Sequence, residues 1–206
     1  MTNKIIGRLK NLPVWFARCR HCRGFGVQSP WAYVFIRYVI GERWSYYAYE
    51  QLDKVVGNIS WSDRRLCHLF FRISNYCRSS VVFDFSSCEN VYEKYIKAGS
   101  VKSRIVKVPT DMTSAEYVSF LDSICVPGYV VLTLEGQWCN FLDAIRCRAD
   151  DRTLVVVRKI NRDNDARRCW KEIVGDARNI VTFDLYYCGI VFFDKKRYKQ
   201  NYIVNF

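Results

Sequence analysis

The hydrophobic residues of this chain follow two different periods that meet near residue 79. Before that point apolar residues recur every three or four positions, as in the stripe of Leu66, Leu69, Phe70 and Ile73, which is typical of amphipathic helices. After it, apolar runs of about five residues alternate with helical segments, the pattern of a mostly parallel sheet covered on both faces. We therefore expect one α/β domain over residues 1–206, with a helical part over 1–78 and a sheet-containing core over 79–206.

Capping and turn residues bound the expected helices. Ser29 followed by Pro30 is a helix start, and Gly41 would end the same helix. Ser86 and Glu89 have the spacing of a capping box for a helix that follows the first strand. Further helices are expected over Ile5–Phe16, over Tyr46–Val56, up to an end near Tyr76, and over Ser114–Ile124 with Thr113 and Glu116 as its capping box.

Six apolar runs have the length of strands. They lie at Val81–Phe85, Arg104–Val108, Tyr129–Leu134, Thr153–Val157, Ile180–Leu185 and Gly189–Phe193. Only a few residues join the last two runs, whereas a parallel crossover needs a dozen or more. These two strands are therefore expected to form an antiparallel hairpin that finishes an otherwise parallel sheet.

Composition limits the size of the core and fixes the sign of the surface charge. Half of the 206 residues are hydrophobic, with six Trp, fourteen Tyr and thirteen Phe, which is ample for one well-packed domain. Lys and Arg number 32 against 20 Asp and Glu, so the formal net charge is +12 and an anionic partner is favoured. Six cations near the start of the chain face no acid: Lys4, Arg8, Lys10, Arg18, Arg20 and Arg23.

The ten Cys are scattered and favour neither a metal site nor a disulfide framework. Only Cys19 and Cys22 are close in sequence, and no second pair at metal-ligand spacing completes a zinc site. Neither a secretory signal nor an apolar run of roughly 20 residues is present, so no transmembrane segment is expected. We therefore expect a cytoplasmic protein in which Cys67, Cys125 and Cys169 are small core residues.

The sequence gives little support to a hydrolase or a kinase. No serine or cysteine nucleophile can be matched with a histidine base, and no Walker-type phosphate loop is present. The chain has only two histidines, His21 and His68, and His68 lies at helical spacing, where a lone histidine is more often structural than catalytic.

Two segments near opposite ends of the chain resemble a known family. The stretch FGVQSPWAYVFI, Phe25–Ile36, is similar to the HGVHSPFVY-type opening of a group of Bacteroidetes class I S-adenosylmethionine-dependent methyltransferase-like proteins. The stretch CGIVFFDKKRYKQNYIVNF, Cys188–Phe206, resembles the C-terminal ending of that group. The resemblance implies a Rossmann-like methyltransferase sheet preceded by N-terminal helices.

Spacing changes the strand order that this resemblance implies. Between Val108 and Tyr129 there is room for one helix, whereas a helix, a strand and another helix would need roughly 35 residues. One strand and its partner helix are therefore expected to be missing. In the usual strand numbering of the methyltransferase sheet the expected order is 2-1-4-5-7-6.

The resemblance also implies a cofactor site at the carboxyl ends of the strands. Asp84 keeps the acid that ends the first strand of the family, and LEGQW, Leu134–Trp138, resembles the family's IDGNH. If Ser86 and Glu89 cap the helix after that strand, they satisfy N–H groups that an anionic ligand would need. The candidate cofactor-binding residues are Asp84, Ser86, Ser87, Asp111, Glu135, Gly136 and Gln137.

Other positions depart from the family pattern. Phe85–Cys88 form a turn that is glycine-rich in the family, so side chains stand where bare backbone would approach the cofactor. Pro109 stands where an acid would hold the ribose hydroxyls, and Asp111 follows two residues late. Arg158 and Lys159 replace paired acids at the end of the fifth family strand, so no divalent metal site is expected there.

Three functions remain open from the sequence. The first is a methyltransferase-fold protein with a degenerate cofactor site, which binds no cofactor, transfers no methyl group and acts as a binding or scaffolding module. The second is an active S-adenosylmethionine-dependent methyltransferase with a divergent pocket that uses Asp84, Glu135 and Gln137. The third is a nucleic-acid or membrane-surface binder that uses the basic N-terminal segment. The acceptor substrate, the partners and the oligomeric state are unknown.

Overall fold

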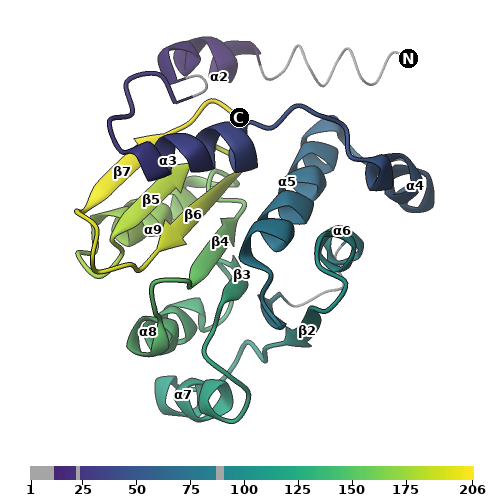
Figure 1. The fold of residues 1–206 in the computed structure, drawn as a ribbon. Helices are drawn as coiled ribbons and strands as arrows, with labels where there is room; N and C mark the ends of the chain where they lie inside the picture. The colour runs from purple at the N-terminus through teal and green to yellow at the C-terminus, as the bar shows by residue number, and fades with distance from the viewer. Residues whose placement is uncertain (1–11, 22–23, 87–90) are drawn as a thin grey trace. The chain divides into compact units, whose positions relative to one another are not determined.

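The first part of the chain is helical in the computed structural model, which describes residues 12–21, 24–86 and 91–206 (Figure 1). As predicted, Ser29 caps a helix by accepting a hydrogen bond from the Ala32 amide at 3.4 Å, and Gly41 ends the π-helical turn that continues it. The predicted helix over Ile5–Phe16 lies largely outside the described residues. The elements are α2 (Leu12–Ala17), the 3-10 helix η1 (Cys19–His21), α3 (Pro30–Phe35), the π-helix η2 (Ile36–Ile40), α4 (Tyr47–Val56) and α5 (Trp61–Cys77).

The second part alternates strands and helices, as the apolar runs predict. Its strands are β1 (Val81–Phe85), β2 (Arg104–Lys107), β3 (Tyr129–Thr133), β4 (Leu154–Arg158), β5 (Val181–Asp184), β6 (Cys188–Phe192) and β7 (Gln200–Ile203). Its helices are α6 (Tyr92–Gly99), α7 (Ser114–Asp122), α8 (Trp138–Arg148) and α9 (Asn164–Gly175). The single helix α7 lies between β2 and β3, as the spacing between Val108 and Tyr129 predicts.

The sheet is mostly parallel with antiparallel strands at one side. β1 pairs in parallel with β2 and β3, and β3 pairs in parallel with β4. β6 is antiparallel to both β4 and β5, which confirms the predicted hairpin. The order is β2-β1-β3-β4-β6-β5-β7.

This order differs from the expected one by a seventh strand. The expected order 2-1-4-5-7-6, written with chain-order labels, is β2-β1-β3-β4-β6-β5 and makes β5 an edge. In the structure β7 lies beside β5, and the Gln200 amide donates to the Ile180 carbonyl at 2.9 Å. The segment Gln200–Ile203 alternates half-buried and exposed residues and contains no apolar run, so hydrophobic patterning does not detect it.

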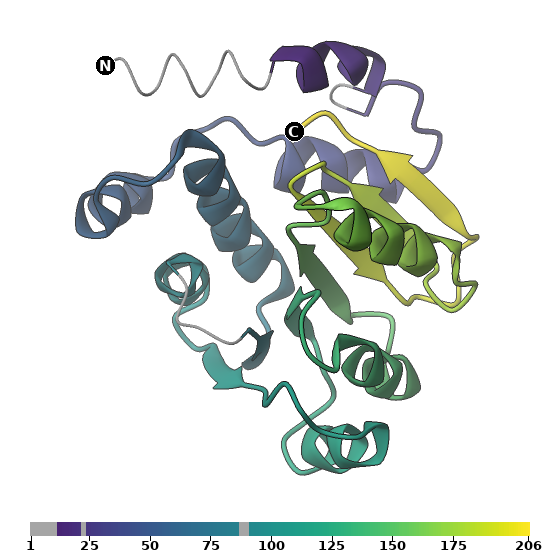
Figure 2. The same ribbon diagram turned by 180° about the vertical axis from the view of Figure 1, so that it is seen from behind.

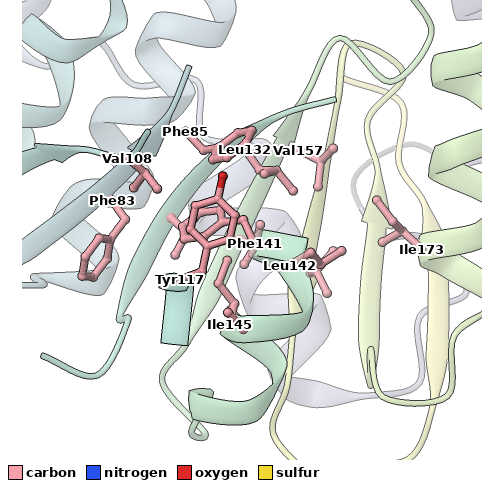
Figure 3. Packing of buried hydrophobic residues seen from close by; sticks show 14 of the residues in the cluster. Phe83, Phe85, Val108, Tyr117, Leu132, Phe141, Leu142, Ile145, Val157 and Ile173 are labelled. Carbon is pink, nitrogen blue, oxygen red and sulfur yellow. The ribbon is translucent and has the colours of Figure 1, made fainter. Parts of the chain in front are cut away.

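Helices α7, α8 and α9 cover one face of the sheet (Figure 2). Between them and the strands lies a cluster of buried side chains, in which Phe85 of β1 stacks on Phe141 of α8 with ring centroids 5.0 Å apart (Figure 3). Tyr117 of α7 packs against the same Phe141 ring at 5.1 Å. The Thr113–Glu116 capping box is present at the start of α7, as predicted. This core fixes where the carboxyl ends of β1, β2 and β3 lie.

The chain separates into two compact units. We call the unit formed by residues 1–76, 90–101 and 203–206 the helical unit, and the unit formed by 77–89 and 102–202 the sheet unit. The helical unit thus contains α6 and the last residues of the chain in addition to the N-terminal helices. The sheet unit contains β1 to β6 together with α7, α8 and α9.

Candidate functional site

Asp84, the acid that the family resemblance assigns to the cofactor, is buried beside a lysine of the sheet unit. It lies in β1 directly opposite Lys107 of β2, and the Lys107 ammonium donates to Asp84 Oδ2 at 2.6 Å. The carboxylate is 1% exposed and the lysine side chain 42% exposed. Ser86, also buried, has its hydroxyl 3.5 Å from the same ammonium. The site therefore already supplies the cation that the buried carboxylate requires.

A contact between two loops spans the carboxyl end of β1. The loops that follow β2 and β3 flank β1 on its two sides, because the strand order there is β2-β1-β3. The Gln137 amide donates to the Thr110 carbonyl at 2.8 Å, which joins the two loops. Gly136 has a φ of 56°, and a Cβ at this position would lie 2.6 Å from the same carbonyl oxygen. Glycine is therefore required at 136 by both backbone conformation and close approach.

Further hydrogen bonds fix both sides of this loop contact. The Thr133 hydroxyl donates to the Phe85 carbonyl at 2.5 Å, at the last residue of β1. The Tyr117 hydroxyl donates to the Pro109 carbonyl at 2.8 Å and accepts from the Met112 amide at 3.3 Å. Burial raises the pKa of Tyr117, which keeps the hydroxyl protonated as a donor. The loop after β2, where the sequence predicted ribose contacts, is instead anchored to α7.

The other predicted site residues that the structure describes have different partners or are exposed. Glu135 pairs with Arg162 at 3.0 Å, in an ion pair whose side chains are 39% and 44% exposed, and the Arg162 guanidinium also binds Asp163 at 2.7 Å. Asp111 is exposed. The Gln137 side chain accepts from Asn140 at 3.2 Å at the start of α8. The sequence analysis named Arg158 and Lys159 as cations at the end of the fifth family strand but did not name Arg162.

Some predicted residues cannot be placed. Ser87 and Glu89 lie outside the described residues, and with them the proposed capping box of Ser86. The same holds for Lys4, Arg8, Lys10 and Arg23 of the basic segment. Of its remaining members, Arg20 is exposed and Arg18 donates to the Val204 carbonyl at 3.4 Å.

Helix α5 of the helical unit carries a polar stripe that the sequence analysis overlooked. Trp61, Arg65, His68 and Arg72 are spaced four, three and four residues apart, which places them on one helix face. All four line a cavity of about 330 Å³. The remaining lining residues are Ile36, Ile40, Gly41, Glu42, Arg43, Val204, Asn205 and Phe206. The sequence does contain this polar pattern, because Arg65, His68 and Arg72 alternate with the apolar stripe that begins at Leu66.

His68 is held in this cavity by a network of polar and aromatic contacts. Its Nε2 lies 3.1 Å from Asp53 Oδ1, which also accepts from the Tyr95 hydroxyl at 2.5 Å. Asp53 Oδ2 accepts from Arg64 at 2.8 Å, and the imidazole stacks on the Tyr49 ring at 3.8 Å. Burial alone would raise the pKa of Asp53, but these three donors outweigh it and lower that pKa.

Neither a metal centre nor a membrane span emerges from the part of the chain that the structure describes. Within residues 12–21, 24–86 and 91–206 no three His, Cys, Asp or Glu side chains gather in a way that would hold an ion. In the same ranges no helix combines the length and the apolar character needed to cross a bilayer.

Comparison of the chain with models of protein families gives no match, and comparison with curated proteins gives none. Its function is therefore inferred from the geometry of its own residues.

Proposed function

We propose that this protein has a class I methyltransferase-like architecture whose cofactor site is closed, and that it acts as a binding module without methyl transfer. The observation that carries the proposal is the backbone contact between Thr110 and Gly136–Gln137, which spans the end of β1. In open α/β sheets, ligands bind in the crevice outside the carboxyl ends of the strands. A cofactor at this crevice would have to separate two loops that are bonded to each other.

The charges of Asp84 and Lys107, which lie at the carboxyl ends of β1 and β2, also support the proposal; we call this end of the sheet the rim. Asp84 is paired with Lys107, so a ligand amine or hydroxyl that needed this carboxylate would have to displace an ammonium already 2.6 Å away. S-adenosylmethionine carries a sulfonium cation, which gains nothing from a rim where Lys107 is already present. The alternative, an active methyltransferase with a divergent pocket, requires the Thr110–Gln137 contact to open when the cofactor binds.

Isothermal titration with S-adenosylmethionine and S-adenosylhomocysteine tests the proposal. We expect no binding tighter than about 1 mM, equivalent to roughly −4 kcal/mol. A micromolar dissociation constant, or cofactor retained through purification, would establish the active enzyme instead.

A Lys107→Gln variant distinguishes the two observations that support the proposal, which are the Thr110–Gln137 contact and the Asp84–Lys107 ion pair. It removes the ammonium from Asp84 but leaves the Thr110–Gln137 contact in place, so we expect it to bind the cofactor no better than the wild-type chain. Micromolar binding by this variant alone would show that charge, and not the loop contact, closes the site.

A further inference from the structure

Arg72 of α5 is a buried cation whose hydrogen-bond partners among the described residues are neutral. Arg72 is 7% exposed. Its Nε donates to the Val39 carbonyl at 2.6 Å, and its Nη2 donates to the Ile40 carbonyl at 3.1 Å. Its Nη1 donates to the Tyr49 hydroxyl at 3.3 Å. Within the described ranges no carboxylate lies at ion-pair distance from it. A guanidinium has five N–H donors, so two remain for another acceptor, and a buried charge without a counter-charge is costly.

A second guanidinium, that of Arg65, lines the same cavity close to two aromatic rings. Arg65 Cζ lies 4.8 Å from the Trp61 ring centroid and 4.5 Å from that of Phe206. Cation–π stacking occupies the two faces of a guanidinium, whereas its N–H donors lie in the plane. The two aromatic rings therefore pack against the Arg65 guanidinium, which brings a second cation to the wall of the cavity.

The side chains that line the cavity carry more positive than negative charge. Among the described lining residues, Arg43, Arg65 and Arg72 carry positive side chains and Glu42 carries a negative one. Glu42 Oε1 accepts from the backbone amides of Arg43 and Trp44 at 2.7 and 2.9 Å, so this oxygen serves the local turn. Burial lowers the pKa of His68, so the imidazole adds no charge near neutral pH.

The other walls of the cavity are apolar, and its size suits a small molecule. Ile36, Ile40, Trp61, Val204 and Phe206 supply hydrophobic surface beside the guanidinium groups. A volume of about 330 Å³ lies at the lower end of the range for small-molecule sites. We propose that this cavity binds a small molecule that carries a compact oxyanion, a phosphate or a carboxylate, on an apolar body. The oxyanion contacts Arg72 and Arg65, and the apolar body contacts Trp61 and the aliphatic wall.

This site is independent of the closed rim of the sheet. All its lining residues belong to the helical unit, whereas Asp84, Thr110 and Gly136 belong to the sheet unit. Failure of cofactor binding at the rim therefore leaves the oxyanion site untouched, and the reverse also holds.

Three small probes test the site on the full chain. Phenyl phosphate and benzoate carry the two oxyanions on the same ring, and benzyl alcohol is the neutral control. In about 0.15 M NaCl, where diffuse surface attraction is screened, we expect one oxyanion probe to bind one-to-one with a Kd below about 1 mM. Benzyl alcohol should bind at least about ten-fold more weakly. The tighter of the two oxyanions identifies the head group, and failure of both overturns the proposal.

Matched variants separate this cavity from general attraction to a basic protein. Arg65→Gln should weaken the preferred probe at least about ten-fold, because it removes a charge-assisted donor pair. Arg168→Gln removes the same charge from an exposed position on α9 and should change the Kd less than about two-fold. Equal weakening by both variants would overturn the proposal.

A measurement on the unaltered protein covers the case in which a variant does not fold. Arg72 binds two backbone carbonyls, so its replacement would also disturb the end of η2. In NMR spectra of the wild-type chain, the Nε–Hε resonances of Arg65 and Arg72 should shift with the probe and saturate together. Resonances that stay in place while heat of binding is observed would locate the ligand elsewhere and refute this site.

Discussion

Two buried charges of opposite sign meet different environments in the two units. Asp84 has Lys107 as a counter-ion, whereas Arg72 has carbonyl and hydroxyl oxygens as its partners. Neutral acceptors compensate a buried charge less completely than an opposite charge does. At the scale of single residues, Arg72 is therefore better placed than Asp84 to attract a ligand of opposite charge, because its charge is less completely compensated.

His68 should make the stability of the helical unit depend on pH. Burial, and then the nearby charges of Arg72 and Arg64, lower its pKa below the ordinary value of 6.5, although Asp53 acts in the opposite direction. The unfolded chain therefore binds a proton more readily than the folded one. The stabilisation is complete above pH 6.5 and is lost as the pH falls from there toward the lowered pKa.

Thermal unfolding midpoints measured between about pH 7.5 and about pH 5 check this expectation. The midpoint should fall with pH in the wild-type chain and fall less in His68→Gln. His21→Gln is the matched control, because it removes the same side chain from an exposed position. Identical slopes in all three proteins would contradict the assignment to His68.

At the scale of elements, α9 packs on β6 through Trp170 and Gly189. The indole donates to Asp184 at 3.0 Å, and a Cβ at position 189 would lie 2.2 Å from its ring. Because the hydrogen bond and burial hold the indole in place, Gly189→Ala should lower the free energy of unfolding by about 1 to 3 kcal/mol.

Urea unfolding measures this loss, and Gly175→Ala is the control. Gly175 lies at the end of the same helix with nothing within 4 Å of an added Cβ, so its replacement should be neutral or stabilising by up to about 1 kcal/mol. If Gly189→Ala unfolds at the same urea concentration as wild type, the packing described for Trp170 is wrong.

Elements were predictable where local pattern decides them. Apolar runs located β1 to β6, and Thr113 with Glu116 located the start of α7. The strand β7 was not predicted, because an edge strand needs no continuous apolar run. Contacts between distant segments were also beyond the sequence, since the neutral partners of Arg72 come from η2 and α4 and the partner of Glu135 is Arg162.

The excess of positive charge acts on the whole molecule. A formal net charge of +12 repels itself more strongly in the compact state than in the expanded one. Raising NaCl from about 0.05 M to about 0.5 M shortens the Debye length from well above 10 Å to about 4 Å. We therefore expect the thermal midpoint to rise over this range at neutral pH. A midpoint that falls would mean that attractive ion pairs, such as Arg148–Asp122, outweigh the repulsion.

The position of β2 gives Lys107 a second role. This strand is the edge of the sheet, and its two end residues, Arg104 and Lys107, are exposed. The N–H and C=O groups along an edge strand form a template onto which a strand of another molecule can add, and a lysine there disfavours such addition because it must be desolvated. The same side chain that neutralises Asp84 thus also disfavours edge-to-edge pairing, so its loss would remove both the ammonium beside a buried carboxylate and a charge from the open edge of the sheet.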